Sequence, residues 1–220
     1  MGKMGGHQLN TDGLNDIAQA ARDHFAAKHR AREGALPLCR ETVRFSANAI
    51  RCVHRRDFAA AEELIGKAAD NLKRAEAGLA EHRDIFHAGF VHDAQKEYAE
   101  AATTLAFIAG RPLPGPEDLG VMAAAYMNGL GETVGELRRH LLDSLREGDV
   151  QHCEEALGAM GDIYDVLVTM DFPEAITGGL RRTTDAMRGI LERTRGDFTM
   201  AAVQRRLEER LDRFQRDLPS

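Results

Sequence analysis

Helical periodicity along almost the whole chain is the sequence feature that most limits the possible fold. Apolar or small residues recur at spacings of three and four from Leu36 to Val53, and the same spacing returns in most later segments. No segment shows sustained period-two alternation or a cluster of β-branched residues, so strands are not expected. Ala, Leu, Arg and Glu dominate the composition, and these residues favour helices. The sequence therefore predicts an all-α fold.

The length of the chain limits the number of domains. At 220 residues, with 43% hydrophobic and 29% charged residues, the chain can bury one core but is short for two. The first residues lack the apolar middle of a signal peptide. We expect a flexible tail over residues 1–15 and a single all-α domain over residues 16–220.

Charge and cysteine content argue against several classes of protein. A net charge of −6 is unlike that of a protein with a generally basic nucleic-acid-binding surface, although a local basic groove is compatible with it. Cys39, Cys52 and Cys153 have no CxxC spacing and predict neither a zinc site nor a disulfide framework. No apolar run of about 18 residues predicts a membrane span. Isolated cysteines fit a reducing compartment, so we expect a cytoplasmic protein without membrane contact.

Breaker residues divide the periodic pattern into about seven helices. The strongest breaker cluster is Gly110–Pro116, and its last proline suits the first turn of the next helix. Asp57 can cap the second helix, and Gly148, Asp171 and Gly196 begin further turns. The expected helices cover residues 36–54, 58–72, 83–109, 116–146, 150–170, 177–195 and 199–216.

Four glutamates form two pairs on two of the expected helices. Glu97 and Glu100 are three residues apart, and Glu132 and Glu136 are four apart, so each pair projects from one side of its helix. If the two helices meet, four carboxylates converge. Like charges held so close repel unless protons or a divalent cation lie between them. Hard cations with oxygen ligands, Mg²⁺ above all, are the usual reason for such a cluster.

Helical phase gives the two glutamate pairs different surroundings. The first pair borders the apolar stripe of its helix, whereas the second lies nearly opposite the stripe of its own. On spacing alone, the ordinary explanation of the second pair is a solvated surface. However, Gly129, Gly131 and Gly135 lie beside it, and a glycine inside a helix costs roughly 1 kcal/mol. These glycines indicate room for a ligand or for a close neighbouring backbone.

A second kind of metal site is also compatible with the sequence. A di-iron bundle needs Glu/Asp-x-x-His on two helices. Asp84 with His87 and Asp149 with His152 have this spacing, but the second motif lies at a helix boundary. Nucleophile elbows and phosphate-binding glycine loops do not occur in the sequence.

Basic residues follow the second glutamate pair within one turn. Arg138, Arg139 and His140 could hold phosphates beside metal-binding acids, which is the arrangement that a phosphodiester-cleaving site requires. The same residues also fit an ordinary solvated helix surface. His87 fits either a nucleic-acid contact or a core histidine packed against the neighbouring phenylalanines.

Several motifs in the same order resemble the translin superfamily, and most closely its translin-associated factor X branch. The resemblance covers most of the chain from about residue 36. The motifs that carry it are Phe86-His87, Glu97–Ala101, Tyr126–Leu137 and Leu145–Asp149, followed by Leu180–Asp185 and Leu191–Gly196, which resemble the carboxy-terminal helices of microbial members.

The resemblance implies a bundle of about seven helices that assembles into a hollow homo-oligomer, an octamer, with RNA inside. It also implies a Mg²⁺-dependent endoribonuclease that cleaves single-stranded RNA, small-RNA fragments or tRNA precursors. We expect the glutamates to hold Mg²⁺ or Mn²⁺. The catalytic acids of the factor X branch match Glu97, Glu100 and Glu132, and Glu136 matches a further acid. Position 132 is usually Asp in the family, so the carboxylate here is one methylene further from the backbone. His87 resembles part of the nucleic-acid-binding segment of translin.

The sequence therefore supports three hypotheses. The first is a homo-oligomeric, metal-dependent endoribonuclease whose glutamates line the inner wall of the assembly, which explains acids opposite the core. The second is a shell that binds single-stranded RNA or DNA without catalysis, as translin proper does. The third is a di-iron carboxylate bundle.

Overall fold

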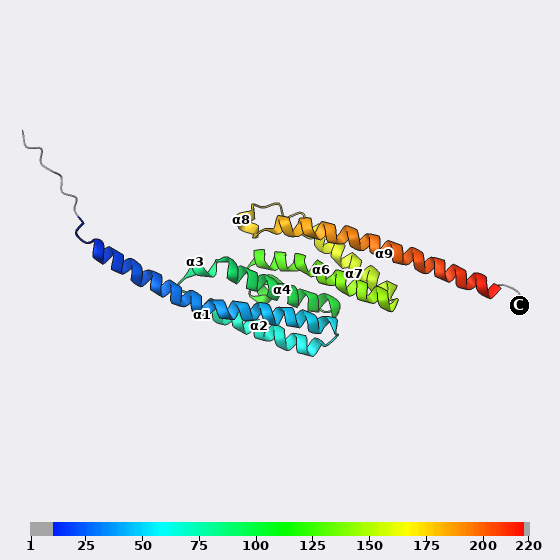
Figure 1. The fold of residues 1–220 in the computed structure, drawn as a ribbon, viewed down its shortest axis with the longest axis horizontal. Helices are drawn as coiled ribbons and strands as arrows, with labels where there is room; N and C mark the ends of the chain where they lie inside the picture. Colours follow the sequence, from blue (N-terminus) through cyan, green and yellow to red (C-terminus); the bar gives the residue numbers. More distant parts are fainter. Residues whose placement is uncertain (1–10, 218–220) are drawn as a thin grey trace, which may run out of the picture.

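The computed structural model describes residues 11–217, and all regular structure in this range is helical. Three of its helices have only four residues, so six long helices make up one all-α domain (Figure 1). The all-α prediction is confirmed. In chain order the helices are α1 (Leu14–His54), α2 (Phe58–Gly78), α3 (Arg83–Phe86), α4 (Gly89–Ile108), α5 (Pro116–Leu119), α6 (Ala123–Glu147), α7 (Val150–Leu167), α8 (Glu174–Thr177) and α9 (Leu180–Asp217).

Two helices are longer than the sequence pattern predicts. Helix α1 already begins at Leu14, and its first buried residue is Ala35, so its N-terminal half has helix-forming residues without an apolar stripe to reveal it. Residues 1–10 of the expected tail lie outside the described residues. Helix α9 continues through Gly196, where two helices were expected to separate. One exposed glycine costs only about 1 kcal/mol, which is too little to end a helix whose other residues favour it.

Two other expected helices are divided. A break at Ala88, whose backbone is extended, separates α3 from α4. Pro116 begins only the short α5, because Gly120 ends that helix in the left-handed conformation at φ 65°. The long α6 therefore begins at Ala123. The predicted turn at residues 148–149 is confirmed, since Gly148 has φ 80° and the side chain of Asp149 accepts a hydrogen bond from the backbone of α7.

The long helices form two groups that meet where α4 packs on α6 (Figure 1). Helices α1, α2 and α4 enclose one apolar cluster, which includes Cys39, Leu72 and Val91. Helices α6, α7 and α9 enclose another, which includes Val134 and Met160. The three cysteines are free and buried. The contact between α4 and α6 is therefore the joint between the two halves of the domain.

The N-terminal part of α1 and the C-terminal part of α9 extend past the bundle at opposite ends of the molecule (Figure 1). Both extensions carry exposed large apolar side chains within the described range. No described helix is long and apolar enough to cross a membrane. On these two extensions, the exposed large apolar side chains are Leu14, Ile17 and Phe25 of α1, and Met200, Val203, Leu207, Leu211 and Phe214 of α9.

Candidate metal centre

A glycine allows α4 and α6 to approach closely. A Cβ atom at Gly129 would lie 2.5 Å from the carbonyl oxygen of Lys96 and 3.0 Å from the backbone nitrogen of Glu100. Any side chain at this position would push the two helices apart. Next to this contact, the hydroxyls of Thr103 and Thr133 are hydrogen-bonded at 2.7 Å in the buried interface.

The other two glycines of α6 differ in their surroundings. A Cβ at Gly131 would lie 2.4 Å from the methyl group of Thr183, so this glycine admits α9 rather than α4. Gly135 has no atom within 4 Å of its Cβ position. The expectation of a close backbone therefore holds for Gly129, whereas Gly135 borders open space.

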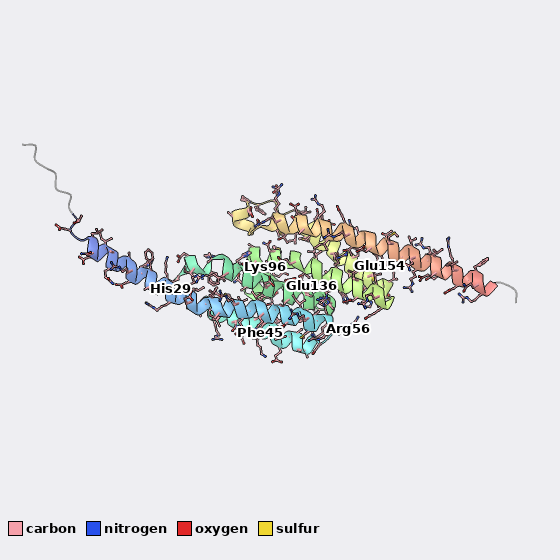
Figure 2. The ribbon with its side chains drawn as sticks, viewed as in Figure 1. His29, Phe45, Arg56, Lys96, Glu136 and Glu154 are labelled. Atoms are coloured by element: carbon pink, nitrogen blue, oxygen red, sulfur yellow. The ribbon has the colours of Figure 1, made fainter. Side chains whose placement is uncertain are left out.

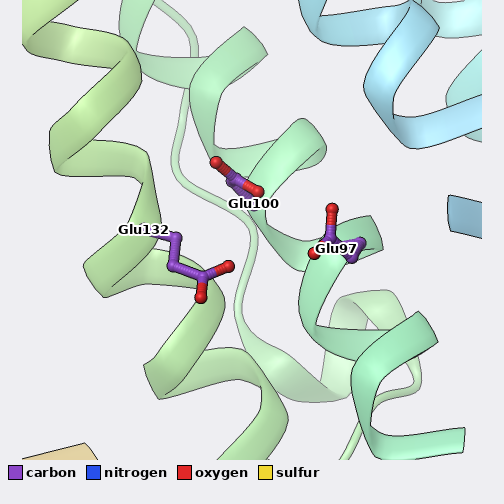
Figure 3. Close-up of side chains that lie close together, drawn as sticks. All are labelled: Glu97, Glu100 and Glu132. Atoms are coloured by element: carbon purple, nitrogen blue, oxygen red, sulfur yellow. The ribbon is translucent and has the colours of Figure 1, made fainter. Parts of the chain in front are cut away.

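The contact between α4 and α6 brings three of the four glutamates together. Glu97 and Glu100 project from α4 and Glu132 from α6 (Figure 3). One carboxylate oxygen of each lies within 4.8 Å of the others, and these three residues form the candidate metal cluster of the described range. Glu100 is the most deeply buried of the three, and the other two are partly exposed. We call these three side chains the carboxylate cluster.

The fourth glutamate has a different partner. Oε2 of Glu136 lies 2.5 Å from Nε2 of His54 at the end of α1, and the His54 side chain is only 4% exposed. This hydrogen bond lowers the pKa of Glu136, and the charges of His54 and Arg139 add to the effect, while burial opposes it. Glu136 is thus held outside the carboxylate cluster, although its charge still acts on Glu100.

Burial and like charge make the carboxylate cluster costly to ionise. Burial raises the pKa of Glu100 to about 8, and the charges of Glu132, Glu97 and Glu136 add to the increase. Burial also raises the pKa of Glu97. At neutral pH, a proton on Glu100 therefore relieves part of the repulsion. A divalent cation can take over this role with a larger charge.

A lysine lies beside the carboxylate cluster, and the sequence reasoning missed it. Nζ of Lys96 is 2.7 Å from Oε1 of Glu132 and 3.6 Å from Oε1 of Glu97. Lys96 and Glu136 both lie near the middle of the bundle (Figure 2). Although burial opposes protonation, the hydrogen bond and charge of Glu132 raise the pKa of Lys96 overall. The only available signal was its position next to Glu97, because the contact with Glu132 spans two helices.

The donor set of the carboxylate cluster fits a hard divalent cation. Mg²⁺ binds oxygen at about 2.1 Å, so oxygens on opposite sides of the ion are about 4 Å apart. The spread of 4.8 Å is close to this value, and small rotations of partly exposed glutamates can close the difference. Carboxylate oxygens without histidine or cysteine ligands favour Mg²⁺, Mn²⁺ or Ca²⁺ over zinc.

The predicted phosphate-binding residues are not gathered at the carboxylate cluster. Arg138 points to α9, where it donates to Oγ1 of Thr194 at 2.9 Å and pairs with Asp197 at 2.8 Å. Arg139 is exposed, whereas His140 is half-buried. Burial lowers the pKa of His140, and nearby positive charges lower it further.

The structure also decides between the alternatives for His87. The ring is exposed and contacts Phe86 edge-on with a centroid distance of 5.2 Å. The core-histidine alternative is therefore wrong.

The metal cluster found among the described residues contains neither of the two Asp-x-x-His motifs that have di-iron spacing. Asp84 pairs with Lys28 of α1 at 2.6 Å. His152 pairs with Asp149, three residues before it, at 2.7 Å. Each aspartate is thus used in a surface ion pair, and the structure does not assemble a di-iron bundle from these residues.

A groove of about 480 Å³ opens beside the carboxylate cluster. Glu100 and Glu132 line one side, and α9 provides Arg182, Ala186 and Ile190 on the other. The acids therefore face a space that a ligand can enter, with apolar and basic groups opposite them.

Comparison with known proteins decides the family. No family model matches the chain. Two solved structures of the translin-like protein AfC3PO, one of them a complex with duplex RNA, are 34% and 33% identical to the chain, with TM-scores of 0.79 and 0.78. Each match covers 86% of this chain and 98% of the other. The chain belongs to the translin superfamily.

Two further proteins are similar to the chain at lower identity. The crystal structure of apo-NeC3PO is 19% identical, with a TM-score of 0.70 over 90% of this chain and 100% of that one, and thus shares the fold. An uncharacterized protein of Methanocaldococcus jannaschii is 29% identical over 195 residues, which are 88% of this chain and 86% of the relative.

Proposed function

We propose that this translin-superfamily protein is a metal-dependent endoribonuclease, with Mg²⁺ or Mn²⁺ bound by Glu97, Glu100 and Glu132. The observation that carries the proposal is the convergence of these carboxylates within 4.8 Å at the joint between the two halves of the domain. The same three positions match the catalytic acids of the factor X branch. A metal ion bound there would lower the pKa of a water molecule and neutralise charge on the scissile phosphate.

The other polar residues receive supporting roles in this proposal. Glu136 is hydrogen-bonded to His54, and its negative charge acts on Glu100 of the carboxylate cluster. The groove beside the cluster accommodates the RNA strand, with Arg182 opposite the acids. Arg139 is exposed and available for a flanking phosphate, whereas Arg138 must first leave Asp197.

The substrate and the assembly are also proposals. AfC3PO has been solved with duplex RNA, which supports RNA as the ligand of this relative. We propose single-stranded RNA as the cleaved form and a hollow octamer as the assembly. The exposed apolar side chains of α9 recur at spacings of three and four from Met200 to Phe214, so they share one face of the helix. An exposed apolar face supports self-association.

Cleavage of a short, end-labelled single-stranded RNA tests the proposal. We expect cutting in Mg²⁺ or Mn²⁺, none in EDTA, and a loss of at least about a hundredfold in Glu97→Gln and Glu132→Gln. Glu147→Gln is the matched control, because Glu147 is an exposed glutamate on the same helix as Glu132. Full metal-dependent cutting by Glu132→Gln would overturn the site.

A shell without catalysis is the second candidate function. It is favoured by Lys96, whose ammonium already balances the charge of Glu132 and Glu97 without a metal ion. This candidate predicts that the protein binds the same RNA tightly in the presence of Mg²⁺ or Mn²⁺. The RNA should remain uncut after long incubation. The cleavage assay, run alongside a filter-binding assay, therefore separates the two functions.

A further inference from the structure

The ammonium of Lys96 lies where its charge opposes a bound metal ion. Its Nζ is 2.7 Å from Oε1 of Glu132 and 3.6 Å from Oε1 of Glu97, and both glutamates belong to the carboxylate cluster. A dication held by the same carboxylates would lie within a few ångströms of this nitrogen. Two positive centres so close together repel strongly in a partly buried site.

The hydrogen bond of Lys96 also engages the carboxylate of Glu132, which belongs to the candidate metal cluster. Side chains of Lys96 and Glu132 come from different helices, so their contact joins α4 to α6 across the cluster. The lysine side chain is 21% exposed and the glutamate side chain 37%, so neither is enclosed by the core. Metal binding and the Lys96–Glu132 ion pair therefore compete for the carboxylate of Glu132.

We propose that Lys96 is an internal competitor of the divalent cation: it holds Glu132 and Glu97 when no metal is bound and must leave them before the ion can enter. The inference rests on the proposed metal site but not on catalysis. It assigns Lys96 a positioning role. The ion pair keeps the repelling carboxylates together in the empty site and sets the cation concentration at which the site fills.

Direct titration with Mn²⁺ tests this competition without RNA or catalysis. Binding is measured as the loss of the electron paramagnetic resonance signal of free Mn²⁺. In Lys96→Met, which keeps an unbranched side chain one atom shorter but removes the charge, we expect the dissociation constant to fall about tenfold. Lys96→Arg, which keeps the charge, should bind no more tightly than the parent protein. Lys67→Met is the matched control, because Lys67 forms an exposed ion pair with Glu63 within α2.

The possible outcomes are distinguishable. Tighter binding in Lys96→Met alone supports the proposal, including the case in which the parent protein binds too weakly to measure. Unchanged or weaker binding in Lys96→Met overturns it, as does tighter binding in both Lys96 variants, since relief of charge would then not be the cause. If neither the parent protein nor Lys96→Met binds Mn²⁺, the proposed function fails as well. If the parent protein binds and cuts while Lys96→Met is unchanged, only the role of Lys96 fails.

Discussion

Replacing Glu100 by glutamine should make the protein without metal more stable at alkaline pH but not at acidic pH. Burial and neighbouring acids raise the pKa of Glu100 in the folded protein to about 8, compared with 4.5 for an ordinary glutamate. Below pH 4.5 the carboxyl group of Glu100 is protonated in both the folded and the unfolded protein, so it does not lower the free energy of unfolding. As the pH rises toward the higher value, the unfolded chain releases its proton while the folded chain retains it, so stability falls. Each pKa unit is worth about 1.4 kcal/mol, and the loss between about pH 5 and pH 9 is therefore on the order of 4 kcal/mol.

Glutamine resembles the protonated acid in shape and carries no charge at any pH. The Glu100→Gln variant should thus match the parent protein near pH 5 and exceed it by several kcal/mol near pH 9. Urea unfolding in EDTA, at one protein concentration and a series of pH values, measures this difference. The exposed Glu76 of α2 provides the control Glu76→Gln, which should not change the pH dependence. A constant difference between Glu100→Gln and the parent protein at all pH values would refute the assignment of a costly buried charge.

Three further predictions concern packing, metal binding and assembly. Gly129→Ala should cost about 1–3 kcal/mol in urea unfolding, because its Cβ would meet the backbone of α4 at 2.5 Å, whereas Gly135→Ala, with open space around its Cβ, should add up to about 1 kcal/mol. Mn²⁺ at a hundred times its dissociation constant should stabilise the protein by about 2.7 kcal/mol in thermal unfolding, and an unchanged shift in Glu132→Gln would contradict the site. Leu207→Glu with Leu211→Glu on the exposed face of α9 should lower the mass measured by light scattering while circular dichroism stays the same; an unchanged mass would exclude this face from the assembly.

The helix boundaries show where local reasoning succeeds. Gly148 and Asp149 were predictable, because a left-handed glycine and an aspartate cap act within a few residues. The helix end predicted at Gly196 was wrong, because α9 continues through this glycine. A single glycine costs about 1 kcal/mol, which does not end a helix that the neighbouring residues favour. Pro116 was placed correctly at a helix start, but four residues later Gly120 ended that helix.

The candidate site shows where local reasoning stops. Spacing placed Glu97 and Glu100 on one side of α4, and the structure agrees because side-chain direction follows from helical geometry alone. Spacing could not show that Arg138 turns to Asp197, 59 residues away, rather than to a phosphate-binding surface. It also could not find the ion pair of Lys96, since that contact depends on the relative rotation of two helices.

The sequence by itself determined that the chain is helical, that each glutamate pair shares a helix face, and that glycines beside Glu132 permit a close neighbour. Only the tertiary structure decided which acids meet. It joined Glu132 to the pair on α4 and held Glu136 against His54. It also buried Glu100, and thereby raised its pKa. The physical reason is that helix propensity and side-chain direction are local properties. Distances between helices, and the burial that changes a charge, arise only when the packed core fixes the helices relative to one another.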